Sequence, residues 1–118
     1  MRVLFDQGTP APLRRCLTGH EVVTAYELGW STLTNGELLG AAETRGFQVL
    51  VTTDTRLKYQ QNLTARSIAI VVLNTTSWPR IRNSAALVAD AIDAASRGSY
   101  AEVDIGPRAV PPLTPPSP

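Results

Sequence analysis

Short, continuous apolar runs constrain the fold of this chain more than any other feature of its sequence. Three such runs occupy Val3–Phe5, Val49–Thr52 and Ile68–Leu73. They are shorter than ordinary helices, and their lack of alternation is typical of strands that are buried in a parallel sheet. Two weaker patterns, Glu21–Thr24 and Tyr100–Ile105, predict one further strand and an edge strand. The sequence therefore predicts a four- to five-stranded, mainly parallel sheet.

Helical patterns lie between the predicted strands. We predict helices over residues 10–17, 34–46 and 55–62, and one long last helix from Ser77 to Gly98. Strands that alternate with helices form an α/β fold, in which right-handed crossovers connect parallel strands. We expect the strand order second, first, third, fourth, which makes the first and third strands neighbours.

Two acids follow these neighbouring strands. Asp6 closes the first apolar run, and Asp54 follows the run that ends at Thr52 and Thr53. Ligands of open α/β sheets bind beyond the carboxyl ends of the strands, at the point where the strand order reverses. Glu37 lies at the start of the predicted helix between them. Because adjacent carboxylates repel unless a cation or proton intervenes, their convergence predicts a divalent metal site.

Each acid also has a structural explanation. Asp54 can cap the helix that follows it. Glu37 can complete a capping box, since Thr34-Asn35-Gly36-Glu37 has the required spacing. Asp6 can accept hydrogen bonds from loop N–H groups. The residues alone are consistent with these structural roles and with the metal site.

Composition restricts which metal the acids can hold. The chain has one cysteine, Cys16, and one histidine, His20, which exclude a disulfide framework, a thiolate zinc site and a histidine-rich site. We therefore expect a hard cation with oxygen ligands, Mg²⁺ or Mn²⁺. The net charge of +1 gives no general attraction to nucleic acids or membranes.

The ends of the chain bear on its domain organisation and location. Its 118 residues suit one domain, which we place at residues 1–106. Six of the nine prolines lie from Pro107 onward, so residues 107–118 are expected to form a disordered tail. The longest apolar run is too short to span a membrane, and no signal peptide is readable, so we expect a cytoplasmic protein without membrane contact.

An amide-rich stretch follows Asp54. Lys58, Gln60, Gln61 and Asn62 lie in or beside the short predicted helix, and Asn74 ends the fourth strand. Amides in the cleft can orient a metal-bound water or hold a sugar or base. The alternative, a polar helix surface, is equally consistent with the sequence.

Four motifs together resemble the compact PIN-like proteins, shortened relatives of the PIN ribonucleases and bacterial toxins. They are Val3-Leu4-Phe5-Asp6, Asn35-Gly36-Glu37-Leu38-Leu39, Leu50-Val51-Thr52-Thr53-Asp54 and Tyr59-Gln60-Gln61-Asn62-Leu63. The resemblance covers roughly residues 1–97. It implies a three-layer α/β/α fold and Mg²⁺- or Mn²⁺-dependent cleavage of RNA.

The resemblance also implies roles for individual residues. Asp6, Glu37 and Asp54 match the family's catalytic, metal-binding acids. Arg56 and Lys58 become candidates to contact the RNA backbone. The implied partners are RNA and, for a toxin of a toxin–antitoxin pair, a small antitoxin protein; a homodimer is left open.

Two departures from the family pattern motivate a second hypothesis. Gln7 stands where relatives often have a second acid, and the additional helical acid of larger PIN nucleases is absent from the sequence. A catalytically degenerate module that binds RNA or a partner protein is therefore the alternative. A phospho-receiver domain is the third reading, since Thr75 follows the fourth strand. A phospho-receiver domain needs two adjacent acids after strand one and a lysine after strand five. This sequence has neither, because Gln7 follows Asp6 and Asp104-Ile105-Gly106 contains no lysine.

Overall fold

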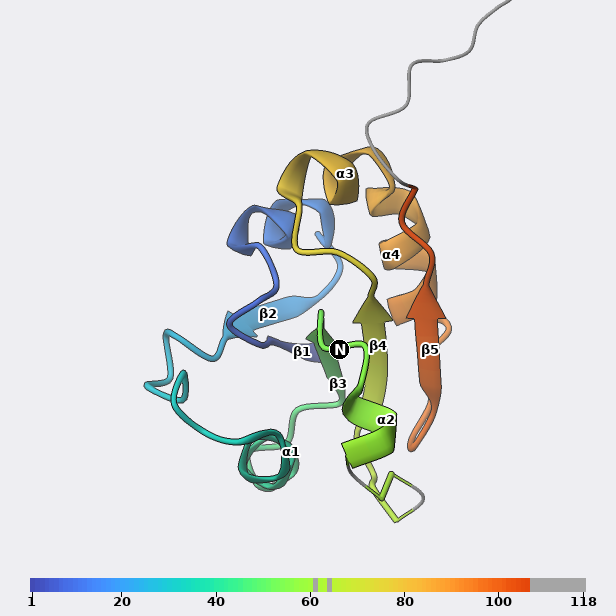
Figure 1. Ribbon diagram of the computed structural model, residues 1–118. Helices are drawn as coiled ribbons and strands as arrows, with labels where there is room; N and C mark the ends of the chain where they lie inside the picture. Colours follow the sequence, from blue (N-terminus) through green and yellow to red (C-terminus); the bar gives the residue numbers. More distant parts are fainter. Residues whose placement is uncertain (61, 64, 107–118) are drawn as a thin grey trace, which may run out of the picture.

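The computed structural model describes residues 1–60, 62–63 and 65–106 of the chain, and the predicted proline-rich tail lies outside them. The described chain forms one five-stranded sheet with helices on both of its faces (Figure 1). The strands are β1 (Arg2–Phe5), β2 (Glu21–Thr24), β3 (Val49–Thr52), β4 (Ala69–Leu73) and β5 (Tyr100–Val103). The helices are η1 (Ala11–Cys16), α1 (Asn35–Thr44), α2 (Leu57–Gln60), α3 (Trp78–Asn83) and α4 (Ala85–Asp93).

The strand order is β2-β1-β3-β4-β5, and every neighbouring pair is parallel. This confirms the predicted parallel α/β sheet, the central position of β1 beside β3, and the additional edge strand. Each edge strand contains one glutamate that forms an ion pair, Glu21 with Arg2 and Glu102 with Lys58. The chain reverses its direction of growth across the sheet at β1 and β3, which places the switch point between their carboxyl ends.

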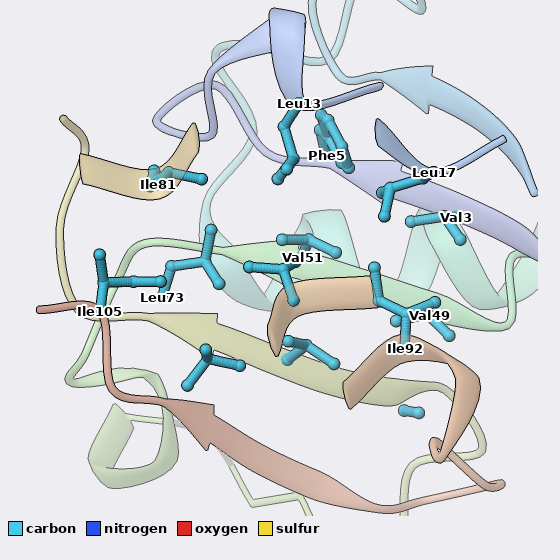
Figure 2. Packing of buried hydrophobic residues seen from close by; sticks show 14 residues of the cluster. Val3, Phe5, Leu13, Leu17, Val49, Val51, Leu73, Ile81, Ile92 and Ile105 are labelled. Carbon is cyan, nitrogen blue, oxygen red and sulfur yellow. The ribbon is translucent and has the colours of Figure 1, made fainter. Parts of the chain in front are cut away.

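Strand alternation divides the core into two clusters, one on each face of the sheet. Figure 2 shows the first, in which Val3 and Phe5 of β1 meet η1, α3 and α4. Leu4 and Leu50 point to the opposite face, where they pack with α1 and α2. Because both faces of the strands are covered, the continuous apolar runs noted in the sequence are explained, and the layers are α/β/α.

The prediction of one long last helix is wrong, because this segment forms two helices and ends earlier than expected. The chain leaves the helical path at Ser84, where φ is −117° and ψ is 19°, and α4 ends at Asp93 rather than near Gly98. Asn83 and Ser84 are poor helix formers because their side chains compete for backbone hydrogen bonds. The predicted apolar stripe survives the break, since Ile81, Val88 and Ile92 are buried.

The segment after β1 also differs from expectation in its helix type. It forms a 3₁₀ helix, with Pro10 at the N-cap and Pro12 in the first turn. The Leu13 N–H bonds the Pro10 carbonyl at 3.1 Å, and the Leu17 N–H bonds the Arg14 carbonyl at 3.1 Å. Short i to i+3 bonds of this kind suit a connection between neighbouring parallel strands.

No helix in the described part of the chain is long and apolar enough to cross a membrane.

Candidate functional site

The register of β1 and β3 determines what lies beside Asp6. Phe5 pairs with Val51, so continuing the parallel register by one residue places Asp6 beside Thr52. Both side chains then lie on the same face, because side chains alternate along each strand. The Thr52 hydroxyl donates a hydrogen bond to the Asp6 Oδ2 atom.

A second threonine fixes the other oxygen of Asp6. The Thr9 hydroxyl lies 2.7 Å from Asp6 Oδ1 and 3.0 Å from the Val51 carbonyl. The loop is closed by the Thr9 N–H, which bonds the Asp6 carbonyl at 3.1 Å. Asp6 is half-buried. Two hydroxyl groups hold its carboxylate in one orientation.

Asp54 is connected to the same threonine. Its backbone N–H donates to Thr52 Oγ1 at 3.1 Å, so the Thr52 hydroxyl accepts from Asp54 while it donates to Asp6. The Asp54 Oδ2 atom accepts from the Asn35 amide at 2.8 Å, and Oδ1 accepts from the Arg56 N–H at 2.9 Å. Thr52 thus links the strand-end acids that the sequence predicted to be neighbours.

Glu37 forms the capping box that the sequence also allowed for it. Its Oε1 atom accepts from the Thr34 N–H at 2.8 Å, and its own N–H donates to the Thr34 hydroxyl at 3.3 Å. At the start of α1, Asn35 is therefore the residue that contacts Asp54. The Glu37 side chain is exposed. Within residues 1–60, 62–63 and 65–106, no group of three or more His, Cys, Asp or Glu side chains could hold a metal ion. The metal-binding role of Glu37 stays a prediction.

A cavity of about 610 Å³ adjoins Asp6 at this end of the sheet. It is formed by the loops that follow β1, β2 and β4. Its lining includes Asp6, Gln7, Tyr26, Thr76 and Trp78. A hollow of this size is within the range of small-ligand sites.

The remaining predicted residues divide between this cavity and a neighbouring surface. Gln7 is exposed at the cavity, and Arg56 is exposed beside Asp54. Lys58 instead lies 3.1 Å from Glu102 and 5.6 Å from the centre of the Tyr100 ring. Its neighbours there include Asn74, in a smaller hollow of about 230 Å³.

Asn74 forms hydrogen bonds with the residues that follow β5. Its amide donates to Asp104 Oδ1 at 2.9 Å, and its carbonyl oxygen accepts from the Ile105 N–H at 3.0 Å. In the amide-rich stretch, Asn62 is exposed, whereas Gln61 and the side chain of Gln60 lie outside the described residues.

Sequence reasoning missed the buried threonines at this edge. Thr9, Thr24 and Thr52 are the buried polar side chains of the described chain, and all three follow or end strands. Thr9 and Thr52 hold Asp6, while Thr24 exchanges hydrogen bonds with Glu27. A threonine at the end of an otherwise apolar run, two residues before an acid, is the signal that would have found Thr52.

Glu27 fixes the turn that follows β2. Its carboxylate accepts two hydrogen bonds from Arg14, at 2.7 and 3.2 Å, and one from the Thr24 N–H at 2.9 Å. The hydrogen bonds from Arg14 and Thr24 hold the pKa of Glu27 below its usual value of 4.5. Glu27 is therefore an ionised anchor of the turn, next to the cavity.

The chain was compared with protein families, curated proteins and solved structures. No family model, no curated protein and no solved structure matches it.

Proposed function

We propose that this chain is a Mg²⁺- or Mn²⁺-dependent ribonuclease whose site lies at the carboxyl ends of β1 and β3. The observation that carries the proposal is the Thr52 hydroxyl, which joins Asp6 to Asp54 at the switch point. A ligand-sized cavity adjoins the first of these acids. RNA is the proposed substrate, and the antitoxin partner and the homodimer stay predictions.

The chemistry of the donor set supports a hard cation. Each Asp6 and Asp54 oxygen accepts one hydrogen bond and retains a second acceptor position. Mg²⁺ sites commonly use one or two carboxylates, with waters and phosphate oxygens completing the shell. The softer ligands lie elsewhere: Cys16 is exposed, and His20 Nε2 lies 2.7 Å from Asp93.

The protein's part in the reaction follows from these contacts. When bound, the ion would supply an activated water and stabilise negative charge on the phosphate. Asp6 and Asp54 would hold it, while the two threonines and Asn35 keep both carboxylates oriented. The exposed Arg56 guanidinium, on the turn after Asp54, is the candidate to contact phosphate oxygens.

Cleavage of a fluorophore–quencher single-stranded RNA in Mn²⁺ tests the proposal. The wild-type chain is compared with Asp6→Asn, Asp54→Asn and the matched control Asp90→Asn, an exposed acid on α4. Loss of at least about tenfold in rate is expected for the first two, and none for the control. All four proteins are purified in parallel, so a contaminating nuclease would give the same cleavage rate in every preparation. Equal cleavage rates in all four proteins would oppose the proposal.

A non-catalytic binding module is the second candidate, and a specific observation favours it. Protein donors satisfy both oxygens of Asp6 and Asp54, and Glu37 is engaged in its capping box, so the acids are stabilised without an ion. Calorimetry separates the candidates. Mn²⁺ binding that is lost in Asp54→Ala supports the nuclease, whereas RNA binding without any Mn²⁺ binding supports the module.

A further inference from the structure

Two aromatic side chains line the cavity beside Asp6. Tyr26, in the turn after β2, is 79% exposed, and Trp78, at the start of α3, is half-buried. Among the large apolar side chains of the described chain, only Leu87 on α4 is exposed to a comparable degree, at 53%. Packing within the fold therefore does not account for the position of the Tyr26 ring.

The backbone that carries Tyr26 is fixed even though its ring is not covered. The Leu28 and Trp30 N–H groups donate to the Ala25 carbonyl at 3.2 and 2.8 Å, and the Gly29 N–H donates to the Tyr26 carbonyl at 3.1 Å. Gly29 has a φ of +74°, which the tight turn requires and glycine allows. An aromatic ring on a fixed turn loses little conformational entropy when a ligand covers it.

Trp78 is fixed from the other side of the cavity. Ser77 caps α3 by accepting a hydrogen bond from the Arg80 N–H at 3.4 Å, and Pro79 occupies the first turn. Part of the Trp78 side chain packs against the core cluster drawn in Figure 2. The rest of the ring lines the cavity.

The polar groups around the cavity favour an uncharged group inside it. Gln7, Ser31 and Thr76 contribute amide and hydroxyl groups to the lining, and Asp6 is the one charged residue among its described residues. With no lysine or arginine among the described residues of the lining, a phosphate beside that carboxylate would be repelled in the absence of a bound cation. A planar base instead offers a face for the rings and an edge for hydrogen bonds.

We propose that Tyr26 and Trp78 form a binding subsite for one unpaired nucleobase of the RNA substrate. This deepens the proposed nuclease function, and rests on it, by specifying single-stranded RNA. A base within a duplex is already stacked and paired, so it cannot enter the cavity. A cation held by Asp6 and Asp54, as in the proposed function, would offset the repulsion of the phosphate next to the bound base.

Tryptophan fluorescence in EDTA tests this subsite without the metal. The Trp30→Phe chain leaves Trp78 as its single tryptophan. It is titrated with a short oligoadenylate, and separately with the same strand annealed to oligouridylate. Saturable quenching by the single strand and little by the duplex is expected. Adding Tyr26→Ala should weaken binding by about fivefold or more, whereas adding Leu87→Ala should not.

Three results would overturn the subsite: equal quenching by both RNA forms, no quenching by either, or unchanged affinity in the Tyr26→Ala chain. Circular dichroism of each variant establishes that it is folded. The subsite and the nuclease fail separately. Quenching without Mn²⁺-dependent cleavage removes the nuclease and keeps the subsite, whereas cleavage by a chain whose Tyr26→Ala variant has an unchanged KM removes the subsite.

Discussion

The Thr52 hydroxyl donates its one proton to the Asp6 carboxylate, and therefore can only accept from the Asp54 N–H. The direction of both hydrogen bonds is thus determined by chemistry. Thr52 is 1% exposed, so water does not compete for either bond. One buried side chain consequently sets the position of both strand-end acids.

Replacing Thr52 by valine should separate this role from side-chain volume. Valine has nearly the same shape but leaves Asp6 Oδ2 without its donor and the Asp54 N–H without its acceptor. We expect Mn²⁺ affinity to fall by about 10- to 100-fold and the free energy of unfolding to fall by about 1–3 kcal/mol. Calorimetry and urea unfolding measure these changes. Thr52→Ser keeps the hydroxyl and is the matched control; equal Mn²⁺ affinity in both variants would contradict the predicted role.

Gly8 should not tolerate a side chain. A Cβ atom at this position would collide with Thr53 Oγ1 and approach Asp6 Oδ1 to 3.8 Å. Gly8→Ala is expected to lower the free energy of unfolding by about 1–3 kcal/mol. In a double-mutant cycle by urea unfolding, Thr53→Ala should recover part of this loss, because it removes the colliding atom. Purely additive effects would show that the loop adapts in another way.

Glu43 should make stability depend on pH. Its burial opposes ionisation, but hydrogen bonds from Arg66 and from the Ser67 N–H, each at 2.7 Å, outweigh burial and lower the pKa of Glu43 below 4.5. A lowered folded-state pKa contributes stability that is present above the unfolded-state value and is lost as pH falls through the folded-state value. Glu43→Gln should therefore cost about 1–3 kcal/mol at pH 7.

That cost should shrink as the pH falls below 4.5, because the unfolded wild-type chain then binds a proton that folded Glu43 still excludes. Urea unfolding of both chains across this range measures the difference. Asp90→Asn, an exposed acid on α4, is the control and should cost little at any pH. A Glu43→Gln cost that stays constant with pH would assign the effect to packing alone.

Two residues of α4 should differ sharply in their contribution to stability. Ile92 is fully buried between α4 and the sheet (Figure 2). Leu87 is 53% exposed. Ile92→Ala is expected to cost about 2–5 kcal/mol in urea unfolding, and Leu87→Ala less than about 0.5 kcal/mol. A similar loss for Leu87 would reveal that it is covered, for instance by another molecule.

The sheet was predictable because each strand is a continuous apolar run between helical patterns, and parallel order follows from that alternation. The break at Ser84 was not, because the apolar stripe of α3 and α4 keeps helical spacing across it. Asp6 and Asp54 were located by their places after strands. The role of Thr52 depends on the register between β1 and β3, which no local pattern in either strand contains.

The two ion pairs at the margins of the sheet have a consequence for association. Glu21 in β2 and Glu102 in β5 are each engaged by a basic side chain, and each of these outermost strands has only four residues. A strand from another molecule would find little length to pair with, and charge beside it. Short outer strands with charged side chains thereby disfavour backbone pairing between copies of this chain.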